Sequence, residues 1–136
     1  MKKLEGKTAL ITGGAQGIGK TIGRRFISEG ASVALCDINF DRAQAAAREL
    51  SGSGGTAQAF HMNVTDESSV EEGVRNVADA FGKIDVLVNN AGITRDTLMI
   101  RMKIEDWNAV LDVNLTGAFI VSRSVVKLMI KARSGR

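Results

Sequence analysis

The sequence predicts an α/β fold in which helices cover both faces of a doubly wound parallel sheet of at least four strands. Two observations lead to this prediction. Short apolar runs alternate with amphipathic helical patterns along the chain, an order that implies right-handed crossovers between parallel strands. A glycine-rich turn also joins the first apolar run to the first helical pattern. The expected strand order is 3-2-1-4, with ligand binding at the carboxyl ends of the strands.

The strands and the first helix are predicted from local patterns. Apolar runs predict four strands, at residues 8–11, 32–36, 56–62 and 84–88. The first helix is expected to begin at Gly17 and to end at Gly30. Its apolar residues Ile18, Ile22 and Phe26 recur at fourfold spacing, which places them on one face of a helix.

The remaining segments predict four further helices and a turn. They are an alanine-rich helix over 41–50, a glycine- and serine-rich turn over 51–55, a helix between the caps at 65–68 and Gly82, a helix over about 105–111, and a long helix over about 114–131. A polar, methionine-rich loop that ends at Met102 precedes the last two helices. Because the chain has no proline, glycine is its only strong structural punctuation.

The turn after the first strand has the sequence Thr12-Gly13-Gly14-Ala15-Gln16-Gly17-Ile18-Gly19. Glycines at such a turn let the backbone approach a pyrophosphate closely, and the N–H groups of the helix N-terminus attract its oxygens. The pattern therefore predicts a dinucleotide-binding, Rossmann-like domain. The alternative is an ordinary glycine turn in which Asp37 caps the next helix.

Asp37 closes the second strand, eighteen residues after Gly19, which is the spacing of the dinucleotide fingerprint. A carboxylate at this position accepts hydrogen bonds from the adenosine ribose hydroxyls and opposes a 2′-phosphate. The glycine turn carries Gln16 rather than a basic residue, and residues 38–40 are also uncharged. A 2′-phosphate thus lacks an evident partner. The expected cofactor is NAD rather than NADP.

Length and composition predict one soluble domain over residues 1–136, with 44% hydrophobic and 24% charged residues. No apolar run approaches the roughly 20 residues of a membrane span, and residues 1–6 lack the apolar region of a signal peptide. We therefore expect a cytoplasmic protein with no membrane partner. The net charge of +3 gives no case for nucleic-acid binding. The single cysteine, Cys36, lies in an expected buried strand and predicts packing rather than redox chemistry.

Several motifs together resemble the short-chain dehydrogenase/reductase family over essentially the whole chain. They are the glycine turn, Asn63-Val64-Thr65-Asp66, Asn89-Asn90-Ala91-Gly92 and Val113-Asn114-Leu115-Thr116-Gly117. Residues 92–96 and 101–103 are specifically similar to the beta-ketoacyl (3-oxoacyl) acyl-carrier-protein reductase branch. The resemblance implies an NAD(P)-dependent oxidoreductase that interconverts a ketone, expected to be a 3-oxoacyl thioester, and a secondary alcohol. Asp37 departs from the NADP-using members of this branch, so an NAD-dependent polyol or secondary-alcohol dehydrogenase is the alternative.

The resemblance also implies a role for each motif residue. Asn114 matches the active-site asparagine, which supports a proton relay. The implied cofactor-binding residues are Gly13, Gln16, Gly17, Ile18, Gly19, Asp37, Asn63, Val64, Asn90, Ala91, Gly92 and Val113. The turn residues are expected around the pyrophosphate, Asp37 at the adenosine ribose, and residues 63–64 along the adenine. The asparagines at 63 and 90 can cap turns at the same time. No metal site is expected.

The family's catalytic tyrosine has no counterpart here, since the chain contains no tyrosine and ends at Arg136. We therefore expect a cofactor-binding domain truncated before the catalytic Ser/Tyr/Lys segment, and an incomplete sheet with an unpaired edge on strand 84–88. The only histidine, His61, is not expected to replace the tyrosine. The chain alone is expected to be inactive, and a catalytically inactive NAD-binding module is a second hypothesis.

The resemblance implies partners as well. The helices over about 105–131 are similar to the family's dimerisation helices, which predicts a homo-oligomer. The substrate is expected to be a small molecule or a group bound to acyl carrier protein. Arg133 and Arg136 resemble the carrier-facing region of the reductase branch, to which an acidic carrier would be attracted. The alternative for these basic residues is a solvated helix face near the negative end of the last helix.

Overall fold

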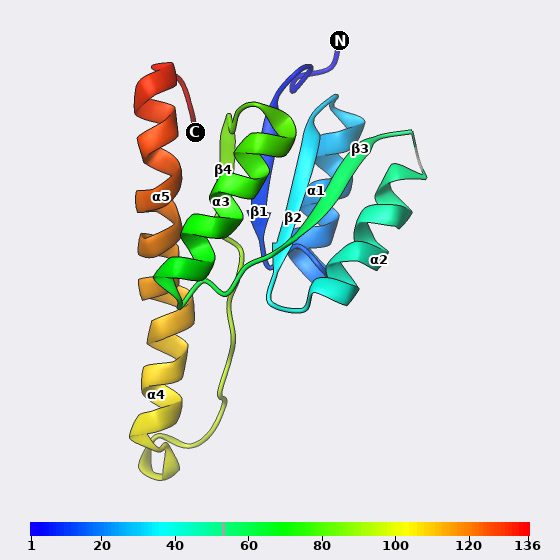
Figure 1. Cartoon of the computed structure of the whole chain (residues 1–136). Coiled ribbons are helices and arrows are strands. Elements are labelled where there is room, and N and C mark those ends of the chain that lie inside the picture. Colours follow the sequence, from blue (N-terminus) through cyan, green and yellow to red (C-terminus); the bar gives the residue numbers. More distant parts are fainter. Residues whose placement is uncertain (53) are drawn as a thin grey trace.

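The computed structural model describes residues 1–52 and 54–136. Its centre is a four-stranded parallel sheet in the order β3-β2-β1-β4 (Figure 1). The strands are β1 Thr8–Thr12, β2 Ser32–Asp37, β3 Thr56–His61 and β4 Val86–Val88. The central residue Leu10 pairs with Ala34 on one side and with Leu87 on the other. The predicted fold class and strand order are confirmed.

Three helices lie between these strands in the chain: α1 Gly17–Ser28, α2 Phe40–Ser51 and α3 Glu67–Phe81. Each boundary has a physical cause. Asn39 caps α2 by accepting a hydrogen bond from Arg42 N, and Asp66 caps α3 by accepting one from Ser69 N. Gly82 ends α3 in the left-handed conformation, as a glycine at this position commonly does. The predicted turn over 51–55 includes Ser53, which lies outside the described residues.

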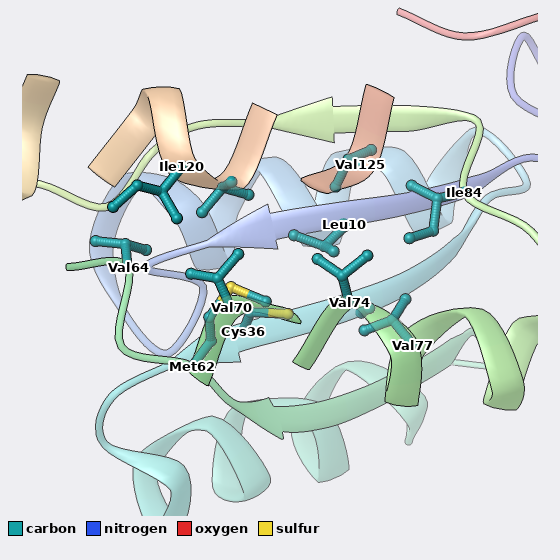
Figure 2. Packing of buried hydrophobic residues seen from close by; sticks show 12 residues of the cluster. Leu10, Cys36, Met62, Val64, Val70, Val74, Val77, Ile84, Ile120 and Val125 are labelled. Carbon is teal, nitrogen blue, oxygen red and sulfur yellow. The ribbon is translucent and has the colours of Figure 1, made fainter. Parts of the chain in front are cut away.

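Two apolar layers hold the sheet between its helices. On one face, Leu10 and Cys36 of the sheet pack with Val70, Val74 and other residues of α3 and with the last helix. Figure 2 shows these side chains pointing toward one another from the strands and the helices. On the other face, Ile11 and Leu35 pack against α1 and α2. Burial on both faces explains why these strands read as continuous apolar runs rather than as alternating patterns.

The fourth strand is shorter than the predicted range of 84–88 because Asp85 uses its side chain in place of regular pairing. Asp85 Oδ2 accepts a hydrogen bond from Thr8 N at 2.9 Å, while Asp85 N donates to Thr8 O at 2.9 Å. Regular pairing with β1 begins only at Val86. The outer edge of this strand was predicted to be unpaired, but Arg136 pairs with part of it. Leu87 N donates to Arg136 O at 2.9 Å and Arg136 N donates to Asp85 O at 3.0 Å.

The two predicted C-terminal helices form one continuous helix, which is a correction to the sequence prediction. The short 3₁₀ segment η1 Met99–Arg101 precedes it, and the helix then comprises α4 Ile104–Leu111, the π turn η2 Asp112–Thr116 and α5 Gly117–Ala132. Gly117 N donates to Asp112 O, five residues back, so the helix widens here instead of breaking. In Figure 1, α4 extends past the sheet while α5 lies alongside it.

This continuous helix of 29 residues, Ile104–Ala132, is long and apolar enough to cross a membrane by length and composition alone. An 18-residue stretch of it has a mean hydropathy of 1.4, and 22% of that stretch is buried in the structure. The prediction that no apolar stretch has this length is therefore wrong. The helix nevertheless places Ile120, Val121 and Val125 in the same apolar layer as Leu10. That packing is typical of a helix that belongs to the core of an α/β domain. The absence of a membrane partner stays a prediction.

Candidate functional site

A cleft of about 480 Å³ lies at the carboxyl ends of the strands. It is lined by Gly13, Gln16, Gly17, Ile18, Asp37, Ile38, Met62, Asn63, Val64, Asn90, Ala91, Gly92, Ile93 and Val113. Eleven of the twelve predicted cofactor-binding residues are in this set, and only Gly19 is not. The sequence reasoning missed Ile38, Met62 and Ile93, although each directly follows or precedes a predicted residue. The cleft is therefore the place where the predicted residues meet.

The glycines at the floor of the cleft allow two chain segments to approach closely. Gly13 has a φ of +63°, and a Cβ there would lie 2.9 Å from Ala91 Cα. A Cβ on Gly19 would overlap the side-chain nitrogen of Asn90 and the carbonyl of Gly13. Gly19 thus packs the start of α1 against the end of β4 instead of lining the cleft. Any side chain at either position would push the turn away from the strand.

The N-terminus of α1 opens on this cleft through Gln16 and Gly17. Within the described residues, the N-cap Gln16 makes no side-chain cap hydrogen bond, and the first turn of α1 carries no acidic residue. The backbone N–H groups and the positive end of the helix dipole consequently have no competing anion from this turn. Such a helix end is suited to binding a phosphate group.

Asp37 is held between the glycine turn and the start of α2. Its Oδ2 accepts a hydrogen bond from Ala15 N at 3.2 Å, and its Oδ1 accepts one from Asn39 N at 2.9 Å. The cap of α2 is Asn39, so the alternative in which Asp37 caps that helix is not what the structure has. Each carboxylate oxygen carries a second lone pair, which leaves acceptors for ligand hydroxyls.

Thr12 and Asn90 join the ends of β1 and β4 beneath the cleft. Thr12 Oγ1 accepts hydrogen bonds from Asn90 N and Ala91 N, both at 3.0 Å, and donates to Val88 O at 3.4 Å. The Asn90 side-chain nitrogen donates to Thr12 O and Gly13 O, again at 3.0 Å. Thr12 was not predicted as a site residue. A buried hydroxyl at the end of an apolar strand is the signal that could have found it.

Asn114 lies in the π turn, beside the cleft rather than in its lining. Its Oδ1 accepts a hydrogen bond from Ile93 N at 2.8 Å, and its Nδ2 donates to Ile93 O at 3.0 Å. Both ends of the amide are therefore engaged by the backbone that follows β4. Gly92 permits this contact, because a Cβ there would lie only 3.3 Å from Asn114 Oδ1. The catalytic role implied for Asn114 stays a prediction.

Cys36 and His61 lie near the cleft in sequence but do not line it. Cys36 is buried, and its burial together with the charge of Asp37 raises the pKa of the thiol well above its usual range, so the thiolate is disfavoured. This agrees with the predicted packing role. His61 pairs with Asp37 in the sheet but does not line the cleft. Residues 1–52 and 54–136 contain no group of three or more His, Cys, Asp or Glu side chains placed to hold a metal ion.

Comparison with known proteins decides the family. The sequence profile described as short chain dehydrogenase matches residues 7–136. The chain belongs to the short-chain dehydrogenase family. The resemblance stated from the motifs is thereby confirmed.

The curated relatives of this short-chain dehydrogenase include two bacterial reductases. It is 50% identical to the 3-oxoacyl-[acyl-carrier-protein] reductase FabG of Thermotoga maritima over 133 residues, which are 98% of this chain and 54% of the relative. It is 42% identical to the FabG of Escherichia coli over 132 residues, which are 97% of this chain and 53% of the relative. The chain thus spans about half the length of these relatives.

Solved structures of the family share the same backbone. An NAD⁺-bound xylitol dehydrogenase superimposes with a TM-score of 0.95 at 36% identity, covering 99% of this chain and 52% of the other. A short-chain type dehydrogenase/reductase from Mycobacterium marinum superimposes with a TM-score of 0.91 at 34% identity, covering 95% and 52%. The fold of this chain is therefore that of about half of each of these two proteins.

Proposed function

We propose that this chain is the cofactor-binding part of an NAD-dependent oxidoreductase that interconverts a ketone and a secondary alcohol. The observation that carries the proposal is that the uncapped N-terminus of α1 and the carboxylate of Asp37 line one cleft. When bound, NAD or NADH supplies the hydride acceptor or donor. The residues of the chain supply binding and orientation, and the glycine floor supports the fit because side chains there would fill the cradle.

Each part of the cleft suits one part of a dinucleotide. The turn Gly13–Gly19 would hold the diphosphate through backbone N–H groups, and Asp37 would accept hydrogen bonds from the adenosine ribose. Asn63 and Val64 would lie along the adenine. Asn90, Ala91 and Gly92 would contact the central part of the cofactor, and Val113 would lie beside Asn114.

The preference for NAD over NADP rests on charge. A 2′-phosphate placed on the ribose would meet the Asp37 carboxylate at close range, and like charges that share a site repel. Asp37 is fixed by its two backbone hydrogen bonds, so it cannot swing away without losing them. We expect NADH to bind at least tenfold more tightly than NADPH, since one such hydrogen-bonded charge contributes about 1.5–3 kcal/mol.

We consider two substrate classes, each with its own support. A 3-oxoacyl thioester carried by acyl carrier protein is favoured by the named reductases and by the match at 92–103. Arg133 at the end of α5 is exposed and would attract an acidic carrier. A polyol or other secondary alcohol is favoured by Asp37 and by the similarity to a xylitol dehydrogenase that binds NAD⁺. A cytoplasmic location is part of the same proposal.

Catalysis by the residues of this sequence alone would lack the family's proton donor, because the sequence contains no tyrosine. We therefore propose that the chain by itself binds cofactor without turnover. That behaviour would also fit the second hypothesis, an NAD-binding module. The two hypotheses differ in whether a protein that contains this chain and a tyrosine–lysine segment reduces a ketone.

The binding proposal is tested by calorimetric titration of the purified chain with NADH and NADPH. Gly19→Ala should abolish measurable binding of both, because its Cβ overlaps Asn90 and the turn. Gly52→Ala is the matched control, since a Cβ there would meet nothing closer than 3.5 Å. Circular dichroism shows whether each variant is folded. A folded wild-type chain that binds neither coenzyme would contradict the proposal.

We also propose that the chain forms homo-oligomers through the helix that runs from Ile104 to Ala132. Exposed apolar side chains follow one stripe of this helix at helical spacing: Ile104, Trp107, Leu111, Leu115 and Phe119. Leu115→Glu should shift the molar mass measured by light scattering toward that of one chain, while the exposed control Lys131→Glu should not. Equal masses for wild type and Leu115→Glu would contradict the proposal.

A further inference from the structure

A basic side chain, Arg42, is hydrogen-bonded to a residue that lines the cleft, although residues 38–40 directly after Asp37 are uncharged. Arg42, in the first turn of α2, donates a hydrogen bond from Nη1 to Gln16 Oε1 at 2.5 Å. Gln16 lines the cleft together with Asp37. The Arg42 guanidinium is therefore one hydrogen bond away from the wall that also carries the carboxylate.

The position of Arg42 is fixed by the same loop that fixes Asp37. Asn39 N donates to Asp37 Oδ1 at 2.9 Å, and Asn39 Oδ1 accepts from Arg42 N at 3.1 Å. Asp37 Oδ2 in turn accepts from Ala15 N, the residue before Gln16. A closed set of hydrogen bonds thus places the carboxylate and the guanidinium at the same end of the cleft.

We propose that Arg42 is a second determinant of coenzyme choice, which binds the 2′-phosphate of a phosphorylated coenzyme and offsets part of the repulsion from Asp37. The inference rests on the proposed function of the cleft. A guanidinium has five N–H donors, so one bond to Gln16 leaves donors for phosphate oxygens. The planar guanidinium also matches the geometry of a phosphate group, to which it can donate two parallel hydrogen bonds.

Two consequences distinguish this role from a purely structural one. A phosphate-binding Arg42 affects NADPH and leaves NADH nearly unchanged. An Arg42 that serves only to hold Gln16, or that stacks on the adenine, affects both coenzymes alike. The ratio of the two dissociation constants is therefore the informative quantity.

The experiment titrates NADH and NADPH into six folded forms of the chain and follows coenzyme fluorescence. These are wild type, Asp37→Asn, Arg42→Met, the double variant, Arg42→Lys and Arg48→Met. Arg48 is an exposed arginine in the last turn of the same helix, so its variant controls for the loss of one positive charge. Asp37→Asn keeps one oxygen as a backbone acceptor while removing the charge. Arg42→Lys keeps the charge and removes the planar fork.

We expect Asp37→Asn to tighten NADPH binding by about tenfold or more. Arg42→Met should weaken NADPH binding by about fivefold in both backgrounds, the effect of an exposed charge pair, with NADH changed less than about twofold. Arg42→Lys should retain most of the NADPH affinity, and Arg48→Met should match wild type.

Equal NADPH affinities with and without Arg42 would overturn the inference, as would equal losses for NADH and NADPH. The Arg42→Met variant alone decides the matter if Asp37→Asn does not fold. A wild-type chain that binds neither coenzyme would contradict the proposed function as well as this inference. A wild-type chain that binds NADH while Arg42→Met leaves NADPH unaffected would contradict the inference alone.

Discussion

Replacing Thr12 by valine tests whether a single hydroxyl joins the two strands beneath the cleft. Valine has nearly the same shape, so the change removes the hydrogen-bonding group and leaves the packing volume. Thr12 is 1% exposed, and its hydroxyl accepts hydrogen bonds from Asn90 N and Ala91 N at 3.0 Å each. The variant leaves both donors without this acceptor, which is more costly than losing a solvent-exposed bond.

The expected loss follows from those two donors. A buried donor deprived of its acceptor costs about 1–3 kcal/mol. Because Asn90 and Ala91 are only half-buried and line the cleft, we expect Thr12→Val to lower the free energy of unfolding by about 2 kcal/mol in total. For a chain of 136 residues this corresponds to a fall in Tm of about 7 °C. Urea denaturation followed by circular dichroism measures the first quantity, and a thermal scan measures the second.

The matched control is Thr8→Val at the other end of the same strand. Thr8 is also buried, but its hydroxyl makes no side-chain hydrogen bond with any residue in the described ranges. This variant should change the free energy of unfolding by less than about 1 kcal/mol. Thr12→Ser, which keeps the hydroxyl, should recover most of the loss. If the two valine variants lose the same amount, the hydrogen bonds of Thr12 do not join the strands as argued.

Three other predictions concern stability and reactivity. Burial alone would raise the pKa of Asp85, but the Thr8 N–H and the neighbouring Lys83 and Lys7 outweigh it and lower that pKa. Asp85→Asn should therefore cost about 1 kcal/mol in urea denaturation at neutral pH, and the difference should shrink as pH falls below about 4 and vanish below the folded pKa. Cys36 should react with Ellman's reagent only after denaturation, because burial keeps its thiol protonated; rapid labelling of the native chain would contradict this. Gly82→Ala should lower the free energy of unfolding by about 1 kcal/mol, and Tm with it, because φ is +79° at this helix end. The cost comes from the backbone conformation, since no atom lies within 4 Å of the added Cβ. An unchanged Tm would show that the helix end relaxes.

The sequence predicted those features that depend on local pattern. The apolar runs identified all four strands, and the glycine turn, which is typical of the dinucleotide-binding fold, indicated the strand order that the sheet adopts. The cleft residues could be named because parallel strands end at one edge, where the turn after β1 and the Asn90 segment after β4 must meet. Their role in cofactor binding remains a prediction.

What the sequence did not predict depends on side chains that act away from their neighbours in the chain. Asp85 shortens β4 because it bonds to Thr8, 77 residues earlier. Arg42 was overlooked because it is five residues from Asp37 in sequence, and only the first turn of α2 brings it to Gln16. The continuous last helix was divided in two because hydrophobic periodicity does not register the extra residue of a π turn.

Binding of the coenzyme and the choice between NADH and NADPH depend on different residues of the cleft. The floor of the cleft is formed by glycines and backbone N–H groups, and the hydrogen bonds of Thr12 and Asn90 support it from beneath. These groups do not distinguish NADH from NADPH. Asp37, which lines the cleft, and Arg42, which donates a hydrogen bond to the lining residue Gln16, bring charges of opposite sign. Substitutions of the floor glycines, Thr12 or Asn90 should therefore change the affinities for NADH and NADPH together. Substitutions of Asp37 or Arg42 should change the ratio of the two affinities. Coenzyme choice in such a cleft can shift without any change in the fold that binds the diphosphate.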